Sequence, residues 1–167
     1  FKAVASGTLP SGKPVVVNAD GTVSVISSQT QALGSAVVFE SGTMQKIASA
    51  FDSNSNKIVI AYRDGGNSSY GTAIVGTISG SSVSFGTAAV FQSALITDVS
   101  MAFDSTANKV VISYASSGGK SVVGTVSGTD ISFGSIETID SGLTTTIENT
   151  ATVYDPDSNK TVVIVKD

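Results

Sequence analysis

The sequence FDSNSNKIVIAY at residues 51–62 recurs as FDSTANKVVISY at residues 103–114 and as YDPDSNKTVVIV at residues 154–165. The starts of these copies are 52 and 51 residues apart. Each copy joins an Asp-x-x-x-Asn segment, typical of a turn, to a strand-like run in which apolar residues recur at every second position. Because self-similarity at a fixed period indicates a repeat architecture, the three copies predict a fold built of repeated units.

Three repeat units align around these copies, at residues 34–85, 86–133 and 134–167, and the last unit is incomplete. The composition is rich in β-branched residues, Gly and Ser, and no apolar face of helical period stands out. The sequence therefore predicts an all-β fold made of tandem four-stranded antiparallel repeats of about 50 residues.

In the second unit, apolar runs separated by turn residues predict each strand. The expected strands lie at residues 88–91, 98–103, 109–114 and 121–126, and residues 131–133 lead into the next unit.

Four short strands in a unit of this length are typical of a propeller blade, so we expect a partial propeller. A β-sandwich of repeated hairpins and a β-solenoid are the competing architectures. A closed propeller needs about four to eight blades, which predicts either a longer chain or a homo-oligomer.

The first residues differ from the repeats. Residues 1–28 read as a small β-hairpin module that serves either oligomerisation or attachment, and residues 29–167 as the repeat domain. Asp20 and Gly21 predict a tight turn between PVVV and TVSVI.

Composition excludes several classes of function. The net charge is -4 and no basic patch is present, so nucleic-acid binding is not expected. No apolar run approaches the roughly 18 residues of a membrane span, so membrane insertion is not expected. The chain has no Cys and no His, which excludes disulfides, thiolate and His metal sites, and His-dependent triads.

The repeated turn is a candidate calcium site, because its oxygen-bearing side chains alternate as they do in calcium loops. The candidate ligands are Asp52, Asn54, Asn56, Asp155, Asp157 and Asn159. The turns lack the Gly at position six and the Glu at position twelve of an EF-hand. The favoured interpretation is a structural hairpin turn with no cofactor, in which Asp accepts backbone hydrogen bonds and Asn adopts a left-handed conformation.

The segment RDGGNSSYG is the second candidate site. Arg63, Asp64, Asn67 and Tyr70 supply the planar polar groups and the aromatic surface that a carbohydrate site uses. The competing interpretation is a long hairpin loop in which Tyr70 packs on the neighbouring strand.

The remaining carboxylates are candidates for a glycosidase pair, which requires two acids about 5 to 10 Å apart. They are Glu40, Asp98, Asp130, Glu137, Asp140 and Glu148. They fall at expected strand ends and turns, where solvated acids are common, so the sequence predicts no enzyme and no catalytic residue.

Residues 51–91, FDSNSNKIVIAYRDGGNSSYGTAIVGTISGSSVSFGTAAVF, resemble the tandem repeats of tail-fibre-like and other virion proteins of marine bacteriophages. The segment ASGTLPSGKPVVVNADGTVSVI at residues 5–26 is similar to the short segment that precedes such repeats. The string YGTAIVGT at residues 70–77 is the most specific part, whereas the second unit has GGKSVVGT instead and lacks the Asn-x-x-Tyr element.

This resemblance implies a virion structural protein, either a fibre or a capsid decoration component, at the virion surface or outside the cell. It implies other virion proteins or copies of this chain as partners, and a host surface glycan as an adhesion target. The alternatives are a carbohydrate-binding, lectin-like β-propeller adhesin and a fragment of a secreted glycoside hydrolase.

Overall fold

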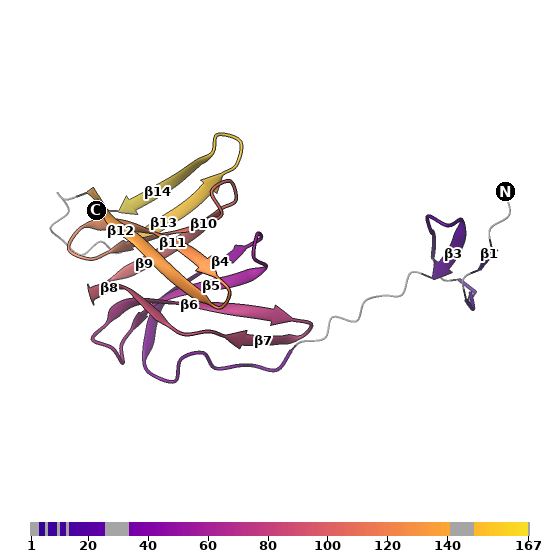
Figure 1. Ribbon diagram of the computed structural model, residues 1–167, viewed down its shortest axis with the longest axis horizontal. Helices are drawn as coiled ribbons and strands as arrows, with labels where there is room; N and C mark the ends of the chain where they lie inside the picture. The colour runs from indigo at the N-terminus through magenta and orange to yellow at the C-terminus, as the bar shows by residue number, and fades with distance from the viewer. Residues whose placement is uncertain are drawn as a thin grey trace. The chain divides into compact units, whose positions relative to one another are not determined.

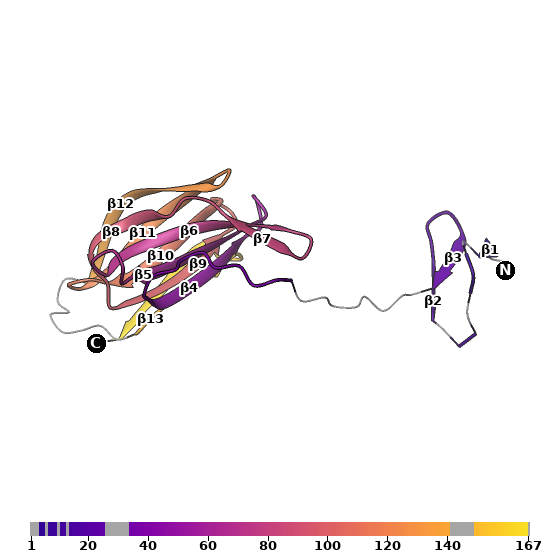
Figure 2. The same ribbon diagram turned by 90° about the horizontal axis from the view of Figure 1, so that it is seen from below.

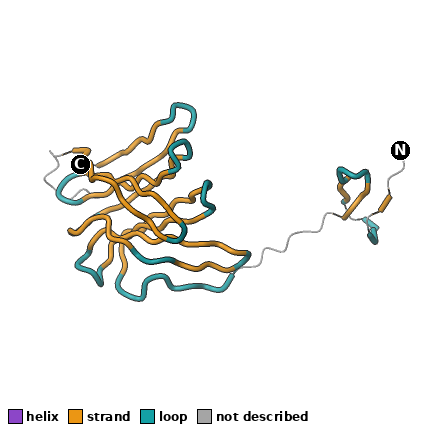
Figure 3. The backbone as a smooth tube through the Cα atoms, viewed as in Figure 1, coloured by secondary structure: helices purple, strands orange, loops and turns teal. Residues whose placement is uncertain are grey.

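The chain divides into two compact units, Phe1–Leu33 and Gly34–Asp167. Every regular element in the described part of the chain is a β-strand, so the all-β prediction is confirmed (Figure 3). The computed structural model describes residues 4–5, 7–9, 11–12, 14–25, 34–140 and 149–166.

The N-terminal unit contains a three-stranded sheet of order β1-β3-β2. Its strands are β1 (Val4–Ala5), β2 (Val15–Val17) and β3 (Thr22–Val25). The predicted hairpin is present, because β2 and β3 pair antiparallel. Hydrogen bonds from the hydroxyl and main-chain N–H of Thr22 hold the turn and lower the pKa of Asp20. The parallel strand β1 was not predicted, since two residues are too few to show a period.

The second unit begins with a sheet that we call the first sheet. Its strands are β4 (Met44–Asp52), β5 (Lys57–Asp64), β6 (Tyr70–Ser79), β7 (Ser82–Phe85) and β8 (Ala89–Leu95). Strands β4 to β7 are hydrogen-bonded in sequence order, and β8 pairs with the part of β6 that β7 leaves open.

Two further sheets follow, the second sheet of order β12-β11-β10-β9 and the two-stranded third sheet. Their strands are β9 (Asp98–Asp104), β10 (Lys109–Ala115), β11 (Gly119–Ser127), β12 (Asp130–Asp140), β13 (Asn149–Asp155) and β14 (Lys160–Lys166).

Strands are present wherever the sequence predicted them in residues 86–133, but one of them pairs differently from expectation. Residues 88–91 were expected to open the second unit, whereas β8 is hydrogen-bonded to β6 of the first sheet. Gly71 of β6 permits this pairing, because a Cβ atom at Gly71 would lie 2.4 Å from the ring of Phe91. The second sheet therefore starts at Asp98.

The repeated sequence forms three hairpins with the same register. Asp52 pairs with Lys57, Asp104 with Lys109 and Asp155 with Lys160, each pair closing a four-residue turn. In the first two hairpins the lysine ammonium also donates to a threonine hydroxyl on the third strand of its sheet. Lys57 reaches Thr77 at 2.8 Å, and Lys109 reaches Thr125 at 2.9 Å.

The three sheets of the second unit stack in chain order, with the second sheet between the other two (Figure 1). Strand β9 packs against β4 on one side and against β13 on the other, so the first strands of the sheets lie along one edge of the stack (Figure 2). The described strands form open sheets and do not close into a barrel or a propeller.

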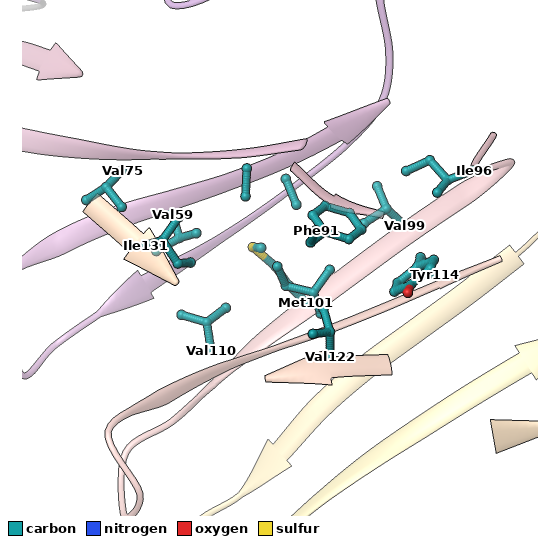
Figure 4. Packing of buried hydrophobic residues seen from close by; sticks show 13 residues of the cluster. Val59, Val75, Phe91, Ile96, Val99, Met101, Val110, Tyr114, Val122 and Ile131 are labelled. Carbon is teal, nitrogen blue, oxygen red and sulfur yellow. The ribbon is translucent and has the colours of Figure 1, made fainter. Parts of the chain in front are cut away.

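The hydrophobic core lies between the first and second sheets (Figure 4). Side chains alternate across a strand, so Val59 and Ala61 of β5 face the second sheet. Ile112 and Tyr114 of β10 face the first sheet in return, and all four residues are fully buried. The cluster also contains Ala73, Val75, Phe91, Ile96, Val99, Met101, Val110, Val122 and Ile131.

The same arrangement of three aromatic rings occurs on the first sheet and on the second sheet. The ring of Phe91 lies 5.1 Å from that of Tyr114 and 5.8 Å from that of Phe133, measured between centroids. Phe39, 52 residues earlier in the sequence, lies 5.6 Å from Tyr62 and 5.3 Å from Phe85. Such tilted pairs add to the stability that area burial supplies.

Burial of Tyr62 and Tyr114, which are both fully buried, predicts a loss of stability at alkaline pH. Burial raises the pKa of Tyr114 to about 12, and burial, Glu40 and Asp64 together raise the pKa of Tyr62 to about 12. The unfolded chain loses these protons near pH 10, before the folded chain does. We expect both tyrosines to contribute their full stability below about pH 10 and to lose it between about pH 10 and 12.

Denaturant unfolding across this pH range checks this expectation in the wild type and in Tyr114→Phe. The substitution removes one titrating group, so the free energy of unfolding should fall less steeply with pH in the variant. Identical slopes in the two proteins would show that Tyr114 ionises alike in the folded and unfolded chains.

Candidate functional site

Asp52 organises the first repeated turn through its carboxylate. Oδ1 accepts hydrogen bonds from the main-chain N–H groups of Asn54 at 2.9 Å and Ser55 at 3.0 Å. Oδ2 accepts one from the hydroxyl of Ser55 at 2.6 Å. Asp52 is buried, and these bonds supply the partners that a buried carboxylate requires.

The other two turns are built in the same way. Asp104 accepts from the N–H groups of Thr106 at 2.9 Å and Ala107 at 2.8 Å. Asp155 accepts from the N–H of Asp157 at 3.0 Å and from the hydroxyl of Ser158 at 2.6 Å. The hydrogen bonds from Ser158 and Asp157 hold the pKa of the Asp155 carboxyl below its usual range.

The asparagine of each turn has a conformational role. Asn56, Asn108 and Asn159 have φ angles of 55°, 55° and 53°. Asn adopts this left-handed region more readily than most residues, because its short polar side chain bonds locally. The backbone therefore explains the Asp-x-x-x-Asn pattern without a cation.

Among the predicted calcium ligands, the carboxylates of Asp52 and Asp155 are engaged in turn formation. Asn54 and Asp157 contribute main-chain N–H donors to these turns. Within the described ranges, no group of three or more Asp or Glu side chains is placed to hold a metal ion. Calcium binding at the turns stays the alternative to the favoured interpretation of a structural turn.

The loop after β5 is also held by hydrogen bonds. Asp64 Oδ1 accepts from the N–H groups of Gly66 and Asn67, each at 3.0 Å. The N–H of Tyr70 donates to the carbonyl of Asn67 at 3.0 Å, and that of Gly65 donates to the carbonyl of Thr43 at 2.8 Å. The loop is therefore a defined hairpin connection that presents Asn67 to solvent.

The four residues predicted to bind a ligand do not share one face. Asp64 pairs directly with Tyr70, so their side chains lie on the same face of the first sheet. Arg63 pairs with Gly71 and therefore points to the opposite face, where its Nε is buried without a hydrogen-bond partner. The structure brings Asp64, Asn67 and Tyr70 together and separates Arg63 from them. Their role in ligand binding stays a prediction.

Two of the acids considered for catalysis accept hydrogen bonds from residues two positions away. Glu40 accepts a hydrogen bond from the N–H of Gly42 at 2.6 Å, and Glu137 accepts one from the hydroxyl of Ser135 at 3.1 Å. Asp130 is exposed at the start of β12. Glu148 lies outside the described residues.

Asp98 joins three sheets, and the sequence did not reveal this role. Its Oδ2 accepts hydrogen bonds from the N–H and the hydroxyl of Thr150 on the third sheet. Its Oδ1 lies 3.9 Å from the ammonium of Lys46 on the first sheet. No local pattern signals this role, since the partners lie about fifty residues away in either direction.

Two further contacts attach the third sheet to the second. The hydroxyls of Ser100 and Thr152 are 2.7 Å apart. The hydroxyl of Tyr154 bonds to that of Thr106 in the neighbouring turn and donates to Asn159 in its own turn. This junction is therefore more polar than the core between the first and second sheets.

No protein-family model, curated protein or solved structure matches the chain. None of the described segments is a helix long and apolar enough to cross a membrane.

The turn geometry predicts that calcium leaves the stability of the chain unchanged. A cation that bound only the folded state would raise the unfolding temperature by mass action. We expect equal unfolding temperatures with excess Ca²⁺ and with a chelator. Asp155→Asn, which keeps an acceptor at Oδ1, serves as the control. A calcium-dependent rise that disappears in this variant would establish a cation site.

Proposed function

We propose that the chain is a non-enzymatic structural protein built of propeller-blade-like, four-stranded repeats. One observation carries this proposal: three hairpins share one turn and one closing pair, and their sheets pack on one another in chain order. The matching Lys–Thr hydrogen bonds and aromatic groups of the first two sheets support it further. A repeated unit with this much shared internal structure is suited to a scaffold.

We propose further that this scaffold belongs to a phage particle, as a fibre or surface decoration component. The resemblance of residues 51–91 and 5–26 to virion repeat proteins supports this role. The polar residues of the repeat support only the structural part of the proposal, because Asp52, Asp104 and Asp155 bond within their own turns.

Peptide mass spectrometry and immunogold labelling of purified phage particles test this assignment. We expect peptides of this chain to sediment with intact particles, and antibodies against the chain to label the particle surface. Detection of the chain only in cell extracts, with particles unlabelled, would contradict a virion role.

Adhesion to a surface glycan is the second candidate function. The ordered loop favours it, because hydrogen bonds hold Asp64, Asn67 and Tyr70 in place before any ligand arrives. Preorganised polar and aromatic groups lower the entropic cost of binding.

A glycan array tests adhesion, with two variants that differ in the face they alter. We expect any binding signal to be lost in Asn67→Ala/Tyr70→Ala. Arg63→Ala, on the opposite face, is the control and should retain the signal. Equal loss in both variants, or no signal from the wild type, would contradict adhesion through this loop.

A further inference from the structure

The third sheet carries an apolar face that points away from the rest of the stack. We call it the C-face and define it by Ala151, Val153, Val162 and Ile164. The opposite face of β13 bonds to the second sheet through Thr150 and Thr152, so alternation directs the C-face outward. Val153, Val162 and Ile164 are 57%, 46% and 59% exposed.

The first sheet carries a second apolar face, on its side away from the core. We call it the N-face and define it by Ile47, Phe51, Ile58 and Ile60. Phe51 pairs with Ile58, and the register places all four side chains on one surface. Ile47 and Phe51 are 55% and 52% exposed.

These two faces are the counterparts of surfaces that meet inside the molecule. Val59 and Ala61 follow Lys57 at the same distances as Val162 and Ile164 follow Lys160, and both are buried against the second sheet. The surface of the first sheet that is equivalent to the C-face therefore packs against the second sheet.

The partner surface on the second sheet is the counterpart of the N-face. Val99 and Phe103 precede their lysine at the same distances as Ile47 and Phe51 precede theirs, and both pack into the core between the sheets. Tyr154 of the third sheet, in the same position as Phe51, contacts Thr106 of the second. The same pair of surfaces is therefore in contact at two successive junctions.

An aromatic ring also lies beside the N-face, as one does between the first and second sheets. Phe91 packs between the sheets, against Tyr114 of the second sheet and beside Gly71 of the first. Phe39 takes the corresponding position beside Tyr62 on the first sheet. The N-face therefore resembles the surface of the second sheet that packs against the first sheet.

We propose that the C-face of one chain docks on the N-face of a second copy, head to tail. Contiguous apolar surface favours burial, and the two internal junctions supply the geometry in which these surfaces fit. Because the two surfaces differ, the contact is heterologous and leaves one of each free, so further copies add in the same way. This proposal does not depend on a virion role.

Light scattering of the full chain over a range of concentrations tests the proposal with two variants. Val162→Lys/Ile164→Lys blocks the C-face, and Ile47→Lys/Phe51→Lys blocks the N-face. We expect the wild type to form higher oligomers as its concentration rises. Each variant alone should remain monomeric, because every docking contact needs both faces.

A mixture of the two variants distinguishes head-to-tail docking from other contacts. The intact C-face of one variant should bind the intact N-face of the other, giving a one-to-one dimer that grows no further. Ile136→Lys, at an equally apolar position on β12 that is 42% exposed and lies outside both faces, should associate like the wild type.

Three results would overturn the proposal: a wild type that is monomeric at every concentration, a mixture that stays monomeric, or a single-face variant that still dimerises alone. Circular dichroism verifies that the variants fold. If a double variant is unfolded, the single substitutions Ile164→Lys and Phe51→Lys replace it in the same mixing experiment.

Discussion

The structure depends on strands that carry apolar side chains on both faces. In β5, Val59 and Ala61 point one way while Ile58 and Ile60 point the other, and β10 repeats this with Ile112 and Val111. A sheet of such strands cannot leave one face in water without exposing apolar surface, so each sheet gains stability from a neighbour on each side. Stacking the sheets in chain order supplies both neighbours for the second sheet, which is covered by the first and the third.

The two junctions of the stack differ in chemistry. The first is an apolar layer around Met101 and Ile112. The second relies on Asp98, on the hydroxyl pair of Ser100 and Thr152, and on the packing of Val165 against Ala115. Ser113 is buried beside this second junction with a hydroxyl that has no partner, which costs stability. The third sheet is therefore held more by hydrogen bonds than by apolar burial.

Local patterns in the sequence were sufficient to predict the hairpins and their turns. The Asp and Asn of each turn act within four residues of each other, and the strand period is visible in the lysine-led runs. The pairing of β8 with β6 was not predictable, because it depends on the room that Gly71 leaves for Phe91. The placement of Arg63 apart from Asp64 was not predicted for a related reason: the two residues are neighbours in sequence, and alternation sends their side chains to opposite faces. The role of Asp98 depends on partners that only the stacking brings near.

Native-state hydrogen exchange tests whether a sheet is stabilised by neighbouring sheets packed on both of its faces. The β9–β10 and β13–β14 hairpins share one turn and one register, but among the described strands only the first hairpin has a sheet packed on each side. Amide protection follows the free energy of local opening. At low protein concentration we expect the amides of β10 to exchange far more slowly than those of β14. Equal protection in the two hairpins would contradict the view that stability comes from stacking, and would assign it to the hairpins themselves.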